Sequence, residues 1–469
     1  MEKLVTRLRL GRSFAFRPTP TLLSRPRIEP PRTKRATPVL RASASLSTVA
    51  AATASMAVYA SLVSKPETPT SVPEDAELAA HHVKGRNGKT ASFRNPHPSA
   101  GDIPPGPWAM PFKLAKAVFN GDLPQPSVKD ITIPTVTPQF LPHRADASSP
   151  LRATWLGHAC YFVEFPGGLR VLFDPVFEDR CAPVQWLGPK RYSPPACSLA
   201  DLPPVDAVVI SHSHYDHLSH PSVLDLAKRN PEAQFFVGLG LEKWFRDCGI
   251  RNVTEMDWWQ QADLTLRRDR MAETSTTKTP EAKTEQDSTT ATTDVKEDPD
   301  VILARISCLP CQHSSGRTGL DRDHTLWASW SVHSGGKSVF FGGDTGYRTV
   351  PKLAPTINDY GPAYSSLPRC PQFKQIGALR GPFDLGLIPI GAYKPRFLMS
   401  PVHANPYDAV EIFKDTRCRR GMGIHWGTWV LTSEEVEEPP RMLREALRAS
   451  GIEEEGVFET CAVGETREF

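Results

Sequence analysis

Outside its first 41 residues, the sequence has no surplus of positive charge. The 469-residue chain carries a formal net charge of +3, and residues 1–41 hold eleven Lys or Arg against only Glu2 and Glu29, a local charge of +9. The remaining residues therefore carry −6. Binding to the phosphate backbone of nucleic acids needs clustered basic side chains, so the body of the chain gives no support to a nucleic-acid-binding function.

Strongly apolar runs are also scarce near the N-terminus. Residues 1–41 are rich in Arg and nearly free of acid, which is typical of a mitochondrial transit peptide; the alternative is a disordered basic tail. Residues 42–64 carry no charge and are long enough to cross a bilayer, but they are mostly Ala, Ser and Thr. They are either a membrane anchor or a flexible stretch near the cleavage site. Both interpretations fit an organelle membrane, and we expect a mitochondrial protein associated with the inner membrane.

The sequence lacks a dense cysteine framework. Its nine cysteines are scattered, and the one close pair is Cys308 and Cys311. A single CxxC pair without a second pair at zinc-ribbon spacing favours two packed thiols at the end of a strand over a zinc or redox site. We therefore expect reduced cysteines.

Residues 65–150 are rich in Pro, and we predict an N-terminal extension that packs on the core or on a membrane surface. From residue 151 onwards, apolar strand-like runs alternate with short helical patterns, which predicts one α/β domain over residues 151–455. Residues 271–300 interrupt this domain with Thr, Glu, Lys and Asp and almost no apolar side chains. We predict that they form a disordered insertion.

The most informative stretch is ISHSHYDHL, which follows an apolar run. It places four side chains of metal-ligand type within six residues: His212, His214, Asp216 and His217. This spacing favours borderline divalent metals such as zinc. Three further residues each follow a predicted buried strand and could complete the site: His313, Asp344 and His425. Paired glycines before Asp344 allow the backbone to bend tightly there.

HSHYDH with a later His, Asp and His resembles the metallo-β-lactamase superfamily, which implies an α/β fold, an αββα sandwich of two mixed sheets flanked by helices. Within it, the sequence resembles the N-acyl-phosphatidylethanolamine-hydrolysing phospholipase D family, from about residue 95 to residue 455. The stretches that carry this resemblance are PPVDAV (203–208), ISHSHYDHL (210–218), LGPKR (187–191), FGGDTGY (341–347), IPIGAYKPR (388–396) and MGIHWGT (422–428). HxHxDH specifies only the superfamily, whereas GAYKPR followed by IHWGT specifies the narrower family.

The resemblance implies two Zn²⁺ ions per chain. One would be bound by His212, His214 and His313, the other by Asp216, His217 and His425, with Asp344 bridging both. The implied reaction is hydrolysis of N-acyl-phosphatidylethanolamine to N-acylethanolamine and phosphatidic acid, by attack of a metal-bridging hydroxide on phosphorus.

The resemblance also assigns roles around the metals. It implies catalytic roles for Asp344, Asp216 and His403, and substrate contacts from His403 and Tyr393. The family often has Gln before the histidine that matches His403, but this chain has Val402 there. One polar contact to the headgroup or acyl amide is therefore missing or replaced.

Two neighbours of the histidine loop complete the expectations. Asp174 follows an apolar strand and recurs in this superfamily beneath the loop, where it would orient a metal-bound His through its free N–H. His220 lies one helical turn beyond His217, and we expect it either to support a ligand or to be exposed.

Other functions remain open on the same residues. Two metals could also activate water towards a carbonyl, as in a lactonase or thioesterase, or towards a nucleic acid, although the acidic body disfavours a nuclease. A non-catalytic lipid-binding protein with structural zinc is a third alternative. We expect a phospholipid substrate at a membrane surface, and two copies could pair as a homodimer to form a groove.

Overall fold

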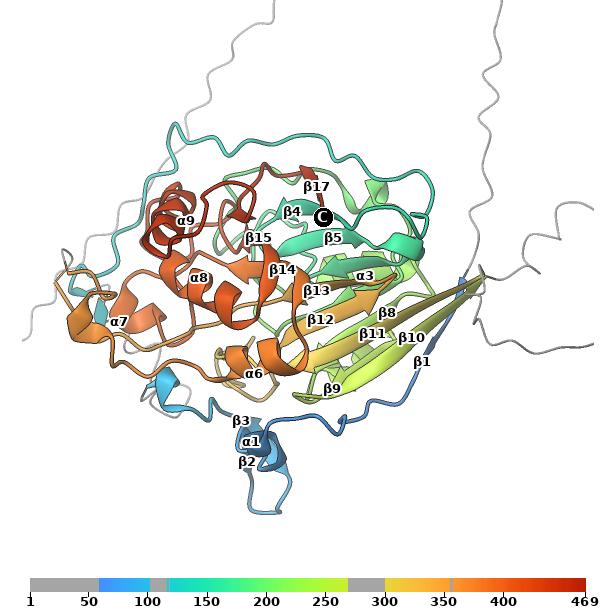
Figure 1. The fold of residues 1–469 in the computed structure, drawn as a ribbon, viewed down its shortest axis with the longest axis horizontal. Helices are drawn as coiled ribbons and strands as arrows, with labels where there is room; N and C mark the ends of the chain where they lie inside the picture. The colour runs from blue at the N-terminus through green and yellow to red at the C-terminus, as the bar shows by residue number, and fades with distance from the viewer. Residues whose placement is uncertain (1–58, 102–115, 118, 269–299, 355–356) are drawn as a thin grey trace, which may run out of the picture. The chain divides into compact units, whose positions relative to one another are not determined.

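A computed structural model describes residues 59–101, 116–117, 119–268, 300–354 and 357–469 (Figure 1). The predicted transit peptide, residues 42–58 of the predicted anchor and residues 271–299 of the predicted insertion lie outside the described residues.

Two large mixed β-sheets form the centre of the described part of the chain. The seven-stranded sheet has the order β17–β4–β5–β6–β7–β8–β9, and the eight-stranded sheet has the order β1–β10–β11–β12–β13–β14–β15–β16. The first sheet comprises β17 (Thr466–Glu468), β4 (Arg152–Gly157), β5 (Cys160–Glu164), β6 (Arg170–Phe173), β7 (Ala207–Val209), β8 (Gln234–Gly238) and β9 (Val253–Met256). The second comprises β1 (Tyr59–Val63), β10 (Gln261–Arg268), β11 (Val301–Leu309), β12 (Ser329–Ser334), β13 (Lys337–Phe341), β14 (Phe383–Pro389), β15 (Cys418–Ile424) and β16 (Phe458–Glu459).

The sheets face each other across a shared apolar core. In β5 the side chains alternate: Tyr161 and Val163 belong to the core between the sheets, while Phe162 belongs to a second cluster on the outer face. The rings of Phe173 on β6 and Phe341 on β13 meet across the interface, with centroids 4.8 Å apart. Because strands buried on both faces have no polar face, they read in the sequence as continuous apolar runs.

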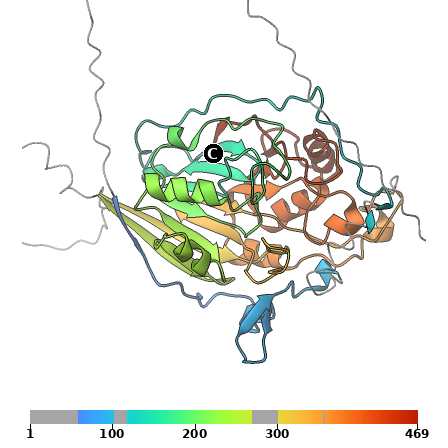
Figure 2. The same ribbon diagram turned by 180° about the vertical axis from the view of Figure 1, so that it is seen from behind.

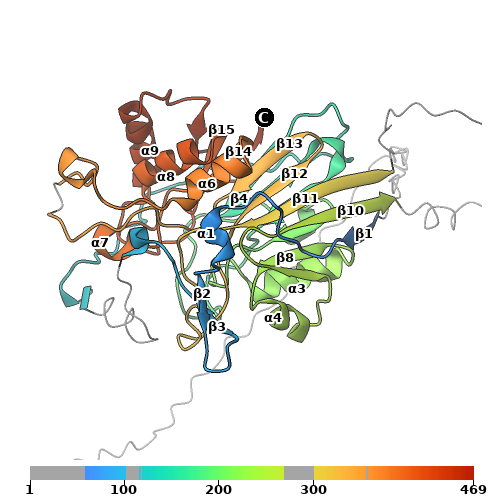
Figure 3. The ribbon, with the colours of Figure 1, turned by 60° about the horizontal axis from the view of Figure 1, so that its bottom comes forward.

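Helices cover the outer faces of both sheets (Figures 2 and 3). The helices α3 (His220–Arg229) and α4 (Glu242–Asp247) place Val223, Leu226 and Phe245 in the outer cluster of the seven-stranded sheet. The helices α6 (Gln372–Leu379), α8 (Pro406–Asp415) and α9 (Glu438–Ala449) lie beside β14 and β15 of the other sheet. The predicted fold class, two mixed sheets flanked by helices, is confirmed.

Several elements were not predicted, among them β10, α9 and β17. Strand β10 alternates buried and exposed residues and carries two Arg at its end, so it lacks the apolar run that marked the other strands. Helix α9 begins with two prolines, and β17 at the C-terminus pairs antiparallel with β4. The domain was predicted to end at residue 455, but residues 466–468 form an edge strand of its seven-stranded sheet.

The N-terminal region contributes both to the sheets and to the core. Strand β1 pairs antiparallel with β10, so Tyr59–Val63, from the predicted anchor, form the edge of a sheet. Strands β2 (His82–Lys84) and β3 (Thr90–Phe93) form a separate hairpin after the short helix α1 (Glu74–Glu77). Ile133 of the Pro-rich extension is 5 % exposed and packs in the main core. Among the described residues, no helix combines the length and apolarity needed to cross a bilayer.

The fold gathers several loops where strands end between the two sheets. The histidine loop follows β7, a Gly342–Gly343 turn follows β13, and His425 follows β15 directly. Gly343 has φ +56°, and a Cβ atom there would lie 2.6 Å from the Cβ of Ser211. Only glycine therefore allows the two loops to approach so closely.

Candidate metal centre

Three imidazoles form the first group of the centre. The Nε2 atom of His212 lies 2.8 Å from Nδ1 of His214, and Nε2 of His313 lies 3.2 and 3.3 Å from these two atoms. The side chains come from the histidine loop and from the segment after β11. Three ring nitrogens that face one another at this spacing suit a shared cation, because imidazoles bind borderline metals through such nitrogens.

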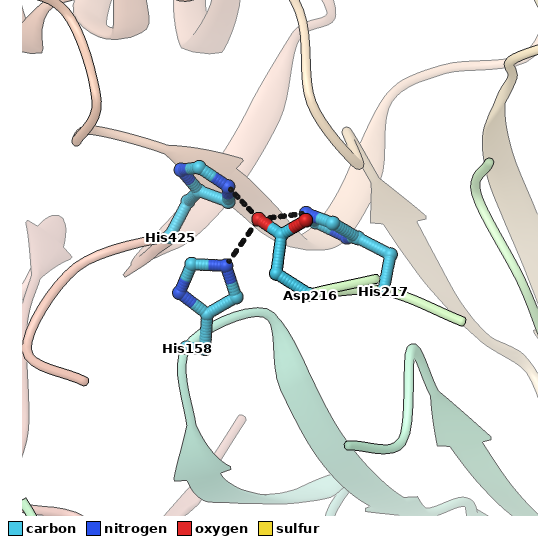
Figure 4. Close-up of side chains that lie close together, drawn as sticks. All are labelled: His158, Asp216, His217 and His425. Atoms are coloured by element: carbon cyan, nitrogen blue, oxygen red, sulfur yellow. Dashed lines mark hydrogen bonds and ion pairs between the residues drawn. The ribbon is translucent and has the colours of Figure 1, made fainter. Parts of the chain in front are cut away.

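The second group is built around the carboxylate of Asp216 (Figure 4). Its Oδ2 atom lies 3.4 Å from Nε2 of His217, 3.3 Å from Nε2 of His425 and 3.1 Å from Nε2 of His158. His217, His425 and His158 are buried. The four side chains offer one ligand atom each within a space that could hold a metal ion.

Asp344 lies between the two groups. Its Oδ2 atom is 3.0 Å from Nε2 of His425 and 3.2 Å from Nε2 of His217. The same oxygen is 3.7 Å from Nε2 of His313 in the first group. Oδ1 of Asp344 and Nε2 of His217 are buried and have no hydrogen-bond partner. Buried polar atoms are rarely left unpaired, so the donor set fits a pair of bound cations.

The charges in the site also fit this interpretation. Burial by itself raises the pKa of Asp344, but the positive charges of His217 and His425 outweigh it and hold this pKa well below its usual range. Burial lowers the pKa of His425, but Asp344 and Asp216 raise it to about 9. In the metal-free chain, protons on His217 and His425 therefore balance the two carboxylates. Divalent cations can replace these protons, because metal ligation requires neutral imidazole.

Hydrogen bonds behind the ligands fix their orientation. Nδ1–H of His217 donates to Oδ2 of Asp174 at 2.6 Å, and Asp174 also accepts from the backbone N–H of Ser211 at 2.7 Å. Nδ1–H of His313 donates to the backbone carbonyl of Val402 at 2.8 Å. Such partners fix the orientation of each ring and keep a proton on Nδ1, so that Nε2 is the nitrogen that can bind a metal once its own proton is lost. The expected contact between Asp174 and a ligand histidine is present.

His158 is the residue of the site that sequence reasoning missed. It occupies the turn between β4 and β5 with φ +52°, and its backbone carbonyl accepts from the N–H of His425 at 3.0 Å. Its ring centroid lies 4.1 Å from that of His425. The available signal was a lone His in LGHA, directly after a buried strand, which is too weak to separate it from a packed core histidine.

A cavity of about 290 Å³ opens over the centre. It is lined by Cys181, Pro189, His214, Tyr215, Asp216, Asp344, Ala392, Met399, His403, Leu431 and Thr432. His403 thus lines this cavity, and burial lowers its pKa to about 4. Its Nδ1 atom is buried without a hydrogen-bond partner and lies 3.9 Å from Oδ2 of Asp344.

Other predicted residues lie elsewhere. Tyr393 is 1 % exposed, and its hydroxyl donates to Oε1 of Glu438 at 2.9 Å. It is not among the residues that line the cavity over the centre. His220 is exposed, with its ring 5.8 Å from that of Trp244. Cys308 and Cys311 are both buried free thiols. The structure therefore brings together all seven predicted ligands and His403, but not Tyr393.

The sequence matches known proteins over most of this domain. The family model described as beta-lactamase superfamily domain matches residues 169–426. The chain is 36 % identical over 325 residues to N-acyl-phosphatidylethanolamine-hydrolyzing phospholipase D 1 of Caenorhabditis elegans, covering 68 % of this chain and 76 % of that protein. It is 36 % identical over 316 residues to an uncharacterized protein of Mycobacterium tuberculosis, covering 66 % and 67 %.

A further relative is the mitochondrial N-acyl-phosphatidylethanolamine-hydrolyzing phospholipase D of Saccharomyces cerevisiae, 29 % identical over 308 residues, covering 65 % of this chain and 54 % of that protein. Together with the two sheets and the buried histidine-rich centre, these matches identify the chain as a member of the metallo-β-lactamase superfamily and a homologue of N-acyl-phosphatidylethanolamine-hydrolysing phospholipase D.

Proposed function

We propose that the protein hydrolyses the phosphodiester bond of N-acyl-phosphatidylethanolamine and releases an N-acylethanolamine and phosphatidic acid. The observation that carries this proposal is the position of Asp344, whose Oδ2 atom faces both groups of imidazoles beneath an open cavity. Such an arrangement suits two cations that act together at a phosphate. The lipid is proposed from the C. elegans and S. cerevisiae relatives, which are N-acyl-phosphatidylethanolamine-hydrolyzing phospholipases D by name.

The proposed metal ligands are the residues of the two buried groups and Asp344 between them. His212, His214 and His313 would hold one ion, Asp216, His217 and His425 the other, and Asp344 would contact both. We propose zinc, which favours imidazole and carboxylate ligands, although iron and manganese accept the same donors. When bound, the two ions would lower the pKa of a water molecule and neutralise charge on the phosphate oxygens.

The chain itself positions the substrate. His403 is neutral at neutral pH, and its unpartnered Nδ1 is free to form a hydrogen bond with the phosphate or the acyl amide of a lipid in the cavity. Ala392, Met399 and Leu431 provide apolar walls for the adjoining hydrocarbon. The contact from Val402 to His313 is made by the backbone carbonyl of Val402. Valine in place of glutamine at this position therefore leaves the contact to His313 in place.

His158 and Asp174 lie behind the proposed metal ligands and contact Asp216 and His217. Nε2 of His158 lies 3.1 Å from Oδ2 of Asp216, and Asp174 accepts from His217. We propose that these contacts keep the side chains of Asp216 and His217 oriented towards the metal site during turnover.

We further propose that the protein acts at a mitochondrial membrane. The basic leader supports mitochondrial import, and the S. cerevisiae relative is named as mitochondrial. A phospholipid substrate would bring the cavity to a membrane surface.

The test is product identity. The full chain with its bound metal is supplied with N-acyl-phosphatidylethanolamine in mixed micelles in ¹⁸O-labelled water, and the products are identified by mass spectrometry. N-acylethanolamine with ¹⁸O-labelled phosphatidic acid supports water attack at phosphorus. Label in a free fatty acid instead would mean acyl hydrolysis and would contradict the proposal. No turnover by fully metallated protein would redirect the search to lactones and thioesters.

A further inference from the structure

Two adjacent histidines converge on one carboxylate in the N-terminal region. Nε2 of His81 lies 2.8 Å from Oδ1 of Asp257, and Nε2 of His82 lies 2.8 Å from Oδ2 of the same residue. Asp257 follows β9, whereas His81 precedes β2 and His82 is its first residue, in the β2–β3 hairpin that Figure 3 shows extending from the sheets. None of these residues belongs to the metal centre described above. Their three ligand atoms lie close enough together to hold one metal ion.

The three side chains are held in place from behind. Nδ1 of His82 lies 2.8 Å from Oγ1 of Thr90, the same kind of outer contact that orients His313 in the main centre. The ring of His81 stacks on Trp258, with centroids 4.3 Å apart. Oδ1 of Asp257 accepts from the backbone N–H of Trp258 at 2.8 Å. The ligand atoms are therefore oriented before any ion binds.

Burial and charge suit a cation at this position. The side chains of His81 and His82 are 8 % and 10 % exposed. Burial lowers the pKa of His82, which favours the neutral imidazole that metal ligation requires. Burial raises the pKa of Asp257, but the contacts with His81 and His82 outweigh it and lower this pKa, which favours the carboxylate. Two imidazole nitrogens and one carboxylate are ligands that zinc accepts.

A cavity of about 180 Å³ adjoins the cluster and is lined in part by His81, His97, Asp75 and Trp258. Nε2 of His97 is buried there without a hydrogen-bond partner and lies 3.7 Å from Oδ2 of Asp75. The cavity leaves room for water molecules to fill the coordination positions that three protein ligands leave open.

We propose that His81, His82 and Asp257 form a separate binding site for one borderline divalent cation, with Zn²⁺ the first candidate. The ion would fasten the N-terminal hairpin to the end of β9. This matters for the main centre, because the chain continues from β3 to Asn95, whose side chain binds both backbone polar groups of His313. The site does not depend on the identity of the substrate.

A hydrogen-bonded clasp without metal is the competing explanation, and substitution by Gln separates the two. In His82→Gln, the amide N–H can still donate to Asp257, but the imidazole lone pair is lost. The full-length wild-type protein, His82→Gln and His81→Gln are equilibrated at the same buffered free Zn²⁺ concentration. Zinc per chain is measured by inductively coupled plasma mass spectrometry, and His143→Gln, which changes an exposed histidine, is the matched control.

The proposal predicts that both cluster variants bind one Zn²⁺ fewer per chain than wild type and His143→Gln. It also predicts that added Zn²⁺ raises the melting temperature of wild type more than that of His82→Gln. Equal zinc content in wild type and both cluster variants would overturn the proposed metal site and support the hydrogen-bonded clasp without metal. Because zinc content is read directly, the result stands whether or not the protein hydrolyses N-acyl-phosphatidylethanolamine.

Discussion

Asn95 and His313 are joined through two hydrogen bonds: Nδ2–H of Asn95 donates to the carbonyl of His313 at 2.8 Å, and Oδ1 of Asn95 accepts from the N–H of His313 at 3.1 Å. One side chain of the N-terminal extension thus satisfies both backbone polar groups of a ligand histidine. The extension therefore contributes to the metal centre, although it lies outside the region matched by the family model.

Replacing Asn95 by Ala should loosen His313. Loss of two partly buried hydrogen bonds should lower the free energy of unfolding by about 1–3 kcal/mol, and bound zinc should dissociate faster in the presence of a chelator. Urea unfolding and chelator-release kinetics measure the two effects. Asn252→Ala, which removes one exposed bond to the carbonyl of Pro231, is the control. Unchanged zinc release in Asn95→Ala would show that His313 needs no support from the extension.

Asp344→Asn tests the bridging role. The amide has the same shape as the carboxylate but lacks its charge, so both ions should be held more weakly and hydrolysis should be abolished. Zinc content and turnover of the lipid are measured together. Asp225→Asn, in a surface i,i+4 pair with Arg229, should change neither. Retained turnover in Asp344→Asn, or loss of one ion alone, would rule out a shared ligand.

His158 should act through Asp216. Removal of an outer partner of a metal ligand typically costs 10–100-fold in affinity or activity, so His158→Ala should lower kcat and accelerate zinc loss by about that factor, with little change in KM. In His158→Gln an amide N–H can still reach Oδ2 of Asp216, and part of kcat should return. Equal losses in the two variants would instead indicate a packing role.

The residues that could be predicted share one property: they follow apolar strands at recognisable spacing. Four side chains of metal-ligand type lie within six residues of the histidine loop: His212, His214, Asp216 and His217. Each of the other three, His313, Asp344 and His425, follows a buried apolar run. His158 also follows such a run, but no other His, Asp or Glu lies within five residues of it. Its role appears only when β15 brings His425 beside it.

The direction of a side chain was harder to predict than its place in the chain. Tyr393 lies next to Ala392, which lines the cavity, yet its hydroxyl points to Glu438 on α9, a helix that the sequence analysis did not anticipate. The pairing of His81 and His82 with Asp257 depends in the same way on β9, which was not predicted either. Contacts between distant segments are fixed by packing and leave no local pattern.

The leader can be tested apart from the enzyme. Residues 1–70 fused to a fluorescent protein should enter mitochondria, because an Arg-rich, acid-poor segment favours import. Replacing Arg7, Arg9 and Arg12 by Gln in the fusion should reduce import while leaving the length unchanged. A cytosolic signal from the unaltered fusion would contradict the mitochondrial assignment.

Metal removal should make stability depend on pH in a defined direction. In the metal-free chain the pKa of His425 is raised from 6.5 to about 9, because the charges of Asp344 and Asp216 outweigh burial. A raised folded-state pKa contributes stability that is fully present below pH 6.5 and is lost as the pH rises through about 9. The free energy of unfolding of chelator-treated protein should therefore fall across this window.

The zinc-loaded protein provides the comparison for this measurement. Its imidazoles carry metal in place of protons, so the contribution of His425 should vanish. Buried thiols such as Cys160, whose pKa burial raises, also destabilise the fold at high pH, but they do so in both forms. The metal-free minus metal-loaded difference in urea-derived unfolding free energy therefore isolates the centre. A difference that stays constant from pH 6.5 to 9 would mean that His425 does not hold a proton against Asp344 when the metal is absent.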